Sequence, residues 1–590
     1  MSPQSCSRPV SGLCWSVVID QYGGQPEFAR NTGMRPDEPG VHAPGSATEA
    51  DKNHDPLSRG TGAESRSGPS TDPTLNEAYR PMSSYGNPLP WKLLSLVLAL
   101  ALVVSLWTGH SGGRLDRTEE GLADSISIGL KLAPGNLDIR NQSGTALDQL
   151  LIGNVYEGLV ARDSNNTVIP GLAKDWDISK DGLEYVFHLH KGMHFSNGHT
   201  LDADDVVWSL QELMDHHYQG SEMLKNYRSI ERVDATTVRL RLTRPYQYLL
   251  WELSGRAGLV FDRQATYDMK TAAQGSGPYL IETFRPNDSV LLKADPHYWG
   301  DRKPKTRTIR IRYLTDDNAA VNALRSGDVQ ALAPITANLA GPFRSDPSFQ
   351  VRTGEDTDKF VLAMNGKGEA TSDIRVRQAI RYAIDHEQLI ASRGGVDKAM
   401  GGPIPSLDPG YEDLTGLFPH DPDKARQLLG EAGYGPGHPL RLRLTYANTY
   451  GTELGDQLRS QLKVVGIEMD VRVVEFSVWL QDVHANKNYD LSLVDHGESH
   501  DFYQWATPTY YYNYDSPEVR RLYDQAMDTV SQERSQELLT QAARKVSEDA
   551  AADWLFNYRI TTAWHQGLEG FPVNLNQSLL PLSDLTYRRD

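Results

Sequence analysis

One long apolar segment divides this chain of 590 residues into two unequal parts. Between Trp91 and Trp107 the sequence reads WKLLSLVLALALVVSLW, and after Lys92 it carries no charge. The run is at the short end of what a bilayer-spanning helix needs, roughly 17–25 residues, and it also suits the core of a signal peptide. Tryptophan at both ends is typical of membrane interfaces. The segment therefore predicts export of the chain that follows it.

The end of the apolar segment favours an uncleaved anchor. Residues 106–112 read LWTGHSG, which resembles a bacterial lipoprotein signal except that His110 stands where the lipid-bearing cysteine would be. Residues 105–110 also lack the small-x-small pattern of a cleavage site. We expect residues 91–108 to anchor the protein in the cell membrane, with the following domain outside the cytoplasm. The alternative is cleavage and release.

Residues 1–90 are predicted to form a disordered tail. Stretches such as RPDEPGVHAPGSATEADKNHDP combine proline, glycine, serine and charge without an apolar period. Such a segment buries too little apolar surface to offset the entropy lost on ordering it. Two interpretations stay open: a cytoplasmic interaction tail, or an unstructured leader, including an upstream extension of a coding region that begins at Met82.

The charge balance and the cysteine content narrow the class of protein. Against 59 lysines and arginines there are 77 aspartates and glutamates, which gives a formal charge of −18. A nucleic-acid-binding protein needs clustered basic surface, so the composition argues against this class. The two cysteines, Cys6 and Cys14, both lie in the tail. The folded region therefore contains no disulfide and no cysteine-ligated zinc.

Strand and helix signals are mixed from about residue 116 to residue 590, which predicts an α/β fold. Polar and apolar residues alternate, as in half-buried strands, at 185–190, 237–245, 308–314, 440–446 and 469–476. Apolar residues recur at helical spacing at 203–214, 373–390 and 420–434. In the last of these, Asp421 can cap a helix that begins at Pro422 and ends at Gly433. No nucleotide-binding, zinc-protease or serine-hydrolase motif occurs.

The order of several segments resembles the extracellular solute-binding proteins of peptide and nickel ABC transporters, a group called family 5. These segments are NVYEGLVARD (154–163), 169–210, GSGPYLI (275–281), HYWG (297–300), FVLAMN (360–365), 373–390, GGPIPS (401–406), 420–434 and 464–475. The resemblance covers roughly residues 120–590. It implies a binding protein rather than an enzyme, with no cofactor, that delivers a solute to ABC permease subunits in the membrane.

The resemblance also implies a two-lobed periplasmic-binding-protein clamp of class C with an extra subdomain. Lobe I would comprise 116–160, 274–358 and 554–590, the subdomain 161–273, and lobe II 360–553. Chain crossings near 360–365 and 554–558 would form the hinge. The ligand, most simply a short peptide, would bind between the lobes and favour the closed state of a monomer.

The stretch DHGESHDFYQW, residues 495–505, holds the main candidates for ligand contacts. In peptide-binding members of the family, the segment after the strand at 489–495 carries an aspartate for the ligand's α-ammonium, and Asp501 is the matching residue here. A buried ammonium needs such a carboxylate. Tyr503 and Trp505 would supply flat apolar walls. The alternative for Asp501 is a loop carboxylate that caps the next segment.

The same stretch departs from the family pattern and leaves other ligands open. The tryptophan that usually precedes the aspartate is missing, and no arginine lies between Tyr489 and Trp505. A metal chelate, an amino sugar, an opine-like compound or another small cationic solute would also fit. A different class of function is a sensory ectodomain that signals through the N-terminal tail.

His496, Glu498 and His500 form a possible metal site, because a strand would place all three on one face and nickel or zinc binds such side chains. The alternative is that both histidines are exposed loop residues. If the histidines line the cleft, affinity for a cationic ligand should fall at acid pH, because histidine protonates near pH ~6.5.

Four further residues are weaker candidates for ligand contacts. Tyr446 and Asn448 lie where a strand ends and a helix begins, which is where α/β proteins usually bind ligands. Asn365 ends the predicted hinge strand, and Tyr156 lies in the matching segment of lobe I.

Overall fold

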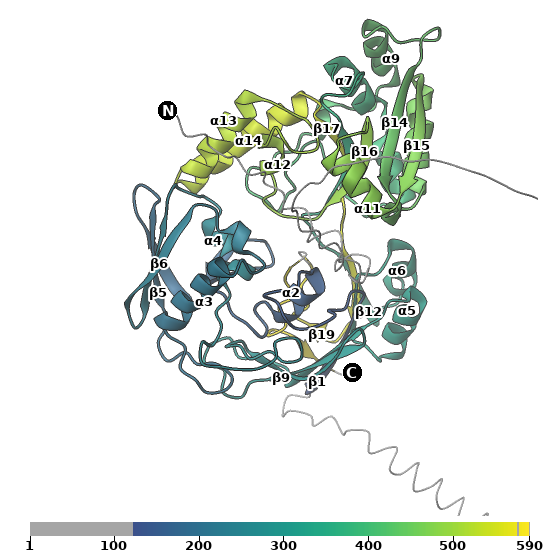
Figure 1. Ribbon diagram of the computed structural model, residues 1–590. Helices are drawn as coiled ribbons and strands as arrows, with labels where there is room; N and C mark the ends of the chain where they lie inside the picture. Colours follow the sequence, from purple (N-terminus) through teal and green to yellow (C-terminus); the bar gives the residue numbers. More distant parts are fainter. Residues whose placement is uncertain (1–121, 575–577, 589–590) are drawn as a thin grey trace, which may run out of the picture. The chain divides into compact units, whose positions relative to one another are not determined.

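The computed structural model describes residues 122–574 and 578–588. The predicted tail at 1–90 and the apolar segment at 91–108 lie outside these residues. In the part that the structure describes, no helix is long and apolar enough to span a bilayer. Two large sheets and one smaller sheet, each covered by helices, confirm the predicted α/β fold (Figure 1).

The first large sheet has seven strands in the order β12-β18-β11-β1-β10-β9-β8. Their bounds are β1 Ser125–Leu130, β8 Tyr279–Arg285, β9 Ser289–Ala294, β10 Thr308–Tyr313, β11 Ala331–Ala333, β12 Phe349–Thr353 and β18 Thr561–His565. Strand β1 runs parallel to both of its neighbours. In β10, Ile309 and Ile311 are fully buried, as the alternation in the sequence predicts. Two helices, α5 (Asp317–Ser326) and α6 (Ala337–Arg344), pack near β11 and β12.

The second large sheet has five strands in the order β15-β14-β16-β13-β17. Their bounds are β13 Lys359–Met364, β14 Leu440–Ala447, β15 Ile467–Val474, β16 Leu491–His496 and β17 Ala552–Asn557. Residues of α7 (Ile374–Ala383), α9 (Pro422–Glu431) and α10 (Glu453–Val464) share a core with this sheet. Helix α9 begins as predicted, since the Asp421 side chain accepts a hydrogen bond from the Lys424 backbone at 2.9 Å.

The chain passes between the two large sheets twice, at residues 354–358 and 558–560. Strand β17 pairs with β13 in the five-stranded sheet. Residues 554–557, which were expected in lobe I, therefore lie in the same sheet as the strands of lobe II. The other lobe boundaries stay a prediction.

A four-stranded sheet with the order β4-β5-β7-β6 lies within residues 161–273. It consists of β4 Ala173–Ile178, β5 Glu184–Leu189, β6 Tyr227–Asp234 and β7 Thr237–Leu242. Helix α3 (Ala203–Asp215) packs on β6 and β7 and begins with a capping box between Asp202 and Asp205. The remaining elements are α2 Thr145–Leu151, β2 Val160–Arg162, β3 Val168–Pro170, α4 Leu249–Glu252, α8 His386–Ser392, α11 Phe476–Trp479, α12 Tyr503–Ala506, α13 Pro517–Asp528, α14 Gln532–Glu548, β19 Leu568–Glu569 and β20 Thr586–Tyr587.

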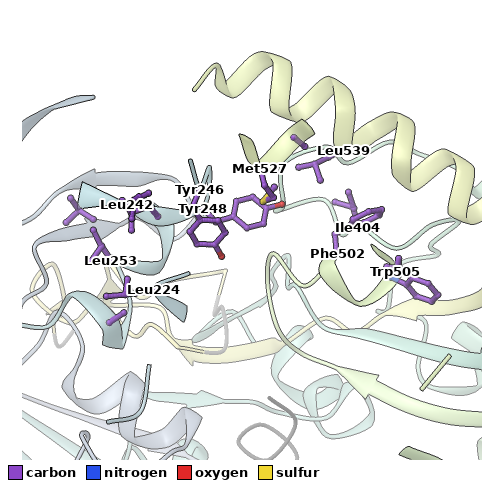
Figure 2. Close-up of a cluster of buried hydrophobic side chains, with 14 of the residues drawn as sticks. Leu224, Leu242, Tyr246, Tyr248, Leu253, Ile404, Phe502, Trp505, Met527 and Leu539 are labelled. Carbon is purple, nitrogen blue, oxygen red and sulfur yellow. The ribbon is translucent and has the colours of Figure 1, made fainter. Parts of the chain in front are cut away.

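The segment after β7 packs against the part of the chain that contains α12 and α13, between β16 and β17. Figure 2 shows Tyr246 and Tyr248 between Leu242 and Leu253 on one side and Phe502 and Met527 on the other. The Gln247 backbone N–H donates to the carbonyl of Met527 at 3.0 Å. Arg244 forms two hydrogen bonds with the carboxylate of Asp528, at 2.8 and 2.7 Å. These contacts bring α4 close to the loop that follows β16.

A buried group of charges lies behind the five-stranded sheet, where β17 meets α7 and α8. The carboxylate of Asp553, which has no exposed surface, lies 3.4 Å from Nε of Arg381 and 3.1 Å from Nε2 of His386. Arg381 also donates to the carbonyls of Ser547 and Gly401. Although burial raises the pKa of Asp553, the two cations outweigh it and lower the pKa overall. Each charge in this group therefore has a partner within the chain.

Candidate ligand-binding site

A cavity of about 220 Å³ lies between the α2–α4 region and the loop after β16. Charged and aromatic side chains from both sides line it, among them Arg162, Lys225, Trp251, Glu252, Glu498 and Tyr503. The first four come from the region of the small sheet, and the last two follow β16. Such a cavity can surround a small ligand with both polar and flat apolar contacts.

Glu498 contributes an unpaired carboxylate to the cavity. Within the described residues, this carboxylate has no hydrogen bond and no ion pair. Burial raises its pKa to about 7; the nearby charge of Asp501 adds to the rise, and the charges of Lys359 and Lys225 oppose it. A cation in the cavity would stabilise the charged form of Glu498.

Glu252, the last residue of α4, contributes a second carboxylate. Its side chain accepts a hydrogen bond from the hydroxyl of Tyr246 at 3.0 Å, and the residue is only 8% exposed. Burial raises its pKa to about 7, although Tyr246, Lys225 and Arg162 all act to lower it, and the charge of Glu498 adds to the rise. The two carboxylates are therefore close enough to repel each other.

Two cations share the cavity. The ammonium of Lys225 lies over the ring of Tyr503, 4.7 Å from its centroid, and burial lowers its pKa. The guanidinium of Arg162 lies 4.6 Å from the centroid of Trp251 and donates to the hydroxyl of Ser578. Burial lowers the pKa of Arg162 to about 10. Among the described residues, neither cation lies within ion-pair distance of a carboxylate.

Asp501, the predicted partner of a ligand ammonium, instead pairs with a lysine of the same chain. Its carboxylate lies 3.2 Å from Nζ of Lys359, and the two side chains are only 5% and 3% exposed. Lys359 also donates to the carbonyls of Thr357 at 3.0 Å and Glu498 at 2.7 Å. Burial raises the pKa of Asp501 to about 6, against the opposing effect of Lys359. Asp501 is not among the residues that line the cavity.

The two histidines of the loop bind protein groups rather than forming a metal site. Nε2 of His496 lies 2.6 Å from the hydroxyl of Tyr512, and Nδ1 of His500 lies 2.7 Å from that of Ser499. Burial lowers the pKa of His496 to about 3 and that of His500 to about 4. The described residues contain no group of three histidine, cysteine, aspartate or glutamate side chains that can hold a metal ion. The set His496, Glu498 and His500 is thus not assembled.

His500 lies between two cavities. Its ring stacks on Trp251 with 4.2 Å between centroids, and its backbone N–H donates to Asp408 at 2.8 Å. A second cavity of about 510 Å³ lies on the other side, and Asn166, Trp251 and His500 line both cavities. The Trp251–His500 stack therefore separates them.

Of the nine residues predicted to contact a ligand, His500 and Tyr503 line the cavity and the others do not. Trp505 is buried and stacks on Tyr512 with 4.3 Å between ring centroids. The side-chain amide of Asn365 donates to the carbonyl of Tyr489 at 2.9 Å.

Tyr156 bonds to the hydroxyl of Tyr267 at 2.8 Å, deep in the core of the seven-stranded sheet. Tyr446 is fully buried, and Asn448 is exposed away from the cavity.

Four residues that line the cavity were not predicted from the sequence: Arg162, Lys225, Trp251 and Glu252. Lys225 and Glu252 belong to no recognisable motif. They reach the cavity because Tyr246 and Tyr248 pack on Phe502 and Met527.

Comparison with known proteins agrees with this architecture. Residues 167–518 match the family described as bacterial extracellular solute-binding proteins, family 5 Middle. The chain is 28% identical over 337 residues to the glutathione-binding protein GsiB of Salmonella paratyphi A, a match that spans 56% of this chain and 65% of that relative. It is also 28% identical over 418 residues to di/tripeptide-binding protein 2 of Pseudomonas aeruginosa, with 64% of this chain and 78% of the relative covered.

Solved structures show the same fold. NikA of Brucella suis in complex with Fe(III)-EDTA superposes with a TM-score of 0.69 at 22% identity, covering 78% of this chain and 99% of NikA. DppA of Helicobacter pylori in complex with the peptide STSA gives a TM-score of 0.65 at 20% identity, covering 79% of this chain and 98% of DppA.

Members of the matched family are binding proteins rather than enzymes, which agrees with the sequence-based expectation. With more than half of its length in the match, this chain belongs to the bacterial extracellular solute-binding proteins of family 5.

Proposed function

We propose that this protein is the extracytoplasmic solute-binding receptor of an ABC importer and that it binds short peptides. The observation that carries the proposal is the cavity lined by charges of both signs without an ion pair among the described residues: Lys225 and Glu498, which are partly buried, and Glu252, which is buried. A peptide carries an ammonium and a carboxylate at its two ends and can match both. At about 220 Å³ the cavity is smaller than the roughly 300–1,000 Å³ typical of drug-sized ligands, so it favours a short ligand.

Binding would couple to closure about the two chain crossings at 354–358 and 558–560. A ligand that contacts groups on both sides of the cavity stabilises the closed state, and ABC permease subunits in the membrane would receive the ligand from that state. Tyr503 and His500 would contact the ligand directly. Asp501 would act through Lys359, whose bond to the Glu498 carbonyl fixes the loop. The names of the glutathione-binding and di/tripeptide-binding relatives support a peptide ligand.

A second candidate is a receptor for another small cationic solute. The two unpaired carboxylates favour it, because they attract a cation whether or not that cation is part of a peptide. A sensory role would depend on the tail before residue 91, which lies outside the described residues.

Native mass spectrometry of the full chain, purified in mild detergent without added histidines, tests the proposal. We expect a mixed set of added masses that resolves into short peptides after denaturation. A single added mass that matches a metal chelate or a small amine would contradict the peptide assignment and favour the second candidate.

A further inference from the structure

We propose that Glu252 and Glu498 together hold an ammonium group of the ligand, one carboxylate from each side of the cavity. Because this pair lies in the same cavity, its role as an ammonium site rests on the proposed function. The site differs from the expected one at Asp501, and it defines the ligand as one that must carry an amine.

The two carboxylates come from parts of the chain that approach each other only in the folded protein. Glu252 ends α4, next to the tyrosines that pack on Met527 and Phe502. Glu498 follows β16. Two like charges across a cavity repel each other unless a cation lies between them. An amine bound there removes the repulsion and links the two sides.

The other charges near the cavity do not supply this cation. Lys359 is committed to Asp501 and to two carbonyls. Lys225 lies over the ring of Tyr503 and Arg162 over the ring of Trp251, and in the described structure neither forms an ion pair. From a distance, Lys225 lowers the pKa of both glutamates and Arg162 lowers the pKa of Glu252, but among the described residues no cation lies within ion-pair distance of Glu252 or Glu498.

A second observation points to a ligand with a separate anionic or carbonyl group. The indole N–H of Trp251 is buried, and no acceptor among the described residues receives it, although Trp251 lines the cavity. A buried donor without an acceptor costs free energy. Together with the ammonium of Lys225, it would bind a carboxylate or carbonyl oxygen. The cavity thus presents negative charge at one place and donors at another, which an amine-bearing zwitterion matches.

The test compares free and acetylated peptides on the full chain. An enzymatic casein digest is divided, one half is acetylated on its amines, and both halves are offered to the wild-type protein and variants in native mass spectrometry. We expect the wild type to retain only free peptides. Glu252→Gln and Glu498→Gln should each weaken binding by at least about tenfold, since each replaces a charged acceptor of the ammonium by a neutral amide. Glu252→Asp keeps the charge and should bind more tightly than Glu252→Gln.

Two controls separate the ammonium site from the proposed function. Glu387→Gln removes an exposed carboxylate in α8 that is not among the lining residues, and it should bind as the wild type does. Putrescine is tested as a peptide-free amine by its effect on the melting temperature.

Each outcome decides between the two proposals. Equal binding of acetylated peptides, or unaffected binding by both glutamine variants, would overturn the ammonium site and leave peptide binding intact. Stabilisation by putrescine that depends on both glutamates, without binding of any peptide, would overturn the peptide ligand and support the site. Failure of both probes to bind the wild type would overturn both.

Discussion

Two groups of buried charge in this protein differ in one respect. Behind the five-stranded sheet, Asp553 has both Arg381 and His386 as partners. Around the cavity, Glu252 and Glu498 have no cation within ion-pair distance among the described residues. A buried charge with a partner serves the fold, whereas one without a partner lowers stability and is retained where a ligand can supply the opposite charge.

Between these extremes is the pair of Lys359 and Asp501. This pair is also buried, but its carboxylate, Asp501, lies only three residues after Glu498 in the same loop. Two carboxylates of one loop therefore have different roles: one holds the loop in place, and the other faces the cavity. The following predictions test this division.

The largest effect is expected at the group behind the sheet. Asp553→Ala leaves Arg381 buried without its counter-charge, which should lower the free energy of unfolding by about 3–5 kcal/mol. Urea unfolding followed by circular dichroism measures the change. A loss below about 1 kcal/mol would show that the group is not structural in this sense.

A loss of stability toward the lower end of that range, about 3 kcal/mol, is expected for Lys359→Met, because Asp501 keeps a buried charge without a partner. The double variant Lys359→Met with Asp501→Leu should recover most of the loss, since apolar side chains replace both charges. The same urea unfolding experiment gives the coupling between the two sites. Additive losses in the double variant would contradict an ion pair that fixes the loop.

Glu498→Gln is expected to change stability in the opposite direction. The folded-state pKa of Glu498 is raised from 4.5 to about 7, so at pH 8 its carboxylate is mostly charged and that charge lowers the stability of the folded state. Removing the charge should raise the free energy of unfolding of the ligand-free protein by about 1–2 kcal/mol, less than the full shift implies, because the loop relaxes. Thermal unfolding at pH 8 checks this, with Glu387→Gln as the control. A destabilised variant would place Glu498 with the structural charges.

The remaining predictions concern pH. Because both glutamates have raised pKa values near 7, the stability they contribute is present below pH 4.5 and is lost as the pH rises through about 7. An ammonium binds their charged forms, so affinity should change in the opposite sense and fall between pH 8 and pH 6, by up to about tenfold for each carboxylate, less the gain from fuller protonation of the peptide's own amine. Calorimetric titration with a peptide that the wild type retains measures this fall.

This pH dependence replaces the one expected from the histidines. With pKa values of about 3 and 4, His496 and His500 stay neutral between pH 6 and pH 8. The double variant Glu252→Gln with Glu498→Gln should therefore lose most of the fall in affinity over this range, with only protonation of Asp501 near pH 6 left to contribute. A fall of wild-type size in the double variant would assign the proton to another group.

Local patterns predicted the fold well because they depend on neighbours in the sequence. The alternation of TIRIRYL placed Ile309 and Ile311 in the core, and Asp421 caps its helix as expected. From the predicted contact residues of the loop at 495–505, His500 and Tyr503 line the cavity, and their contact with a ligand stays a prediction.

The partners of the site residues could not be predicted in the same way. Lys359 lies 142 positions before Asp501, and only the pairing of β13 with β16 brings the two together. Glu252 reaches the cavity because Tyr246 and Tyr248 pack on Met527. Trp505 was expected to be a ligand wall, but it stacks on Tyr512 in the core.

The stack of Trp251 on His500 has a consequence for the length of the ligand. It is a thin partition, two aromatic rings thick, between spaces of about 220 and 510 Å³. Rotation of a single indole would open a passage from one space into the other. The length of the solute that this solute-binding protein accepts would then depend less on the volume of either cavity than on whether the Trp251 side chain keeps its place in the stack.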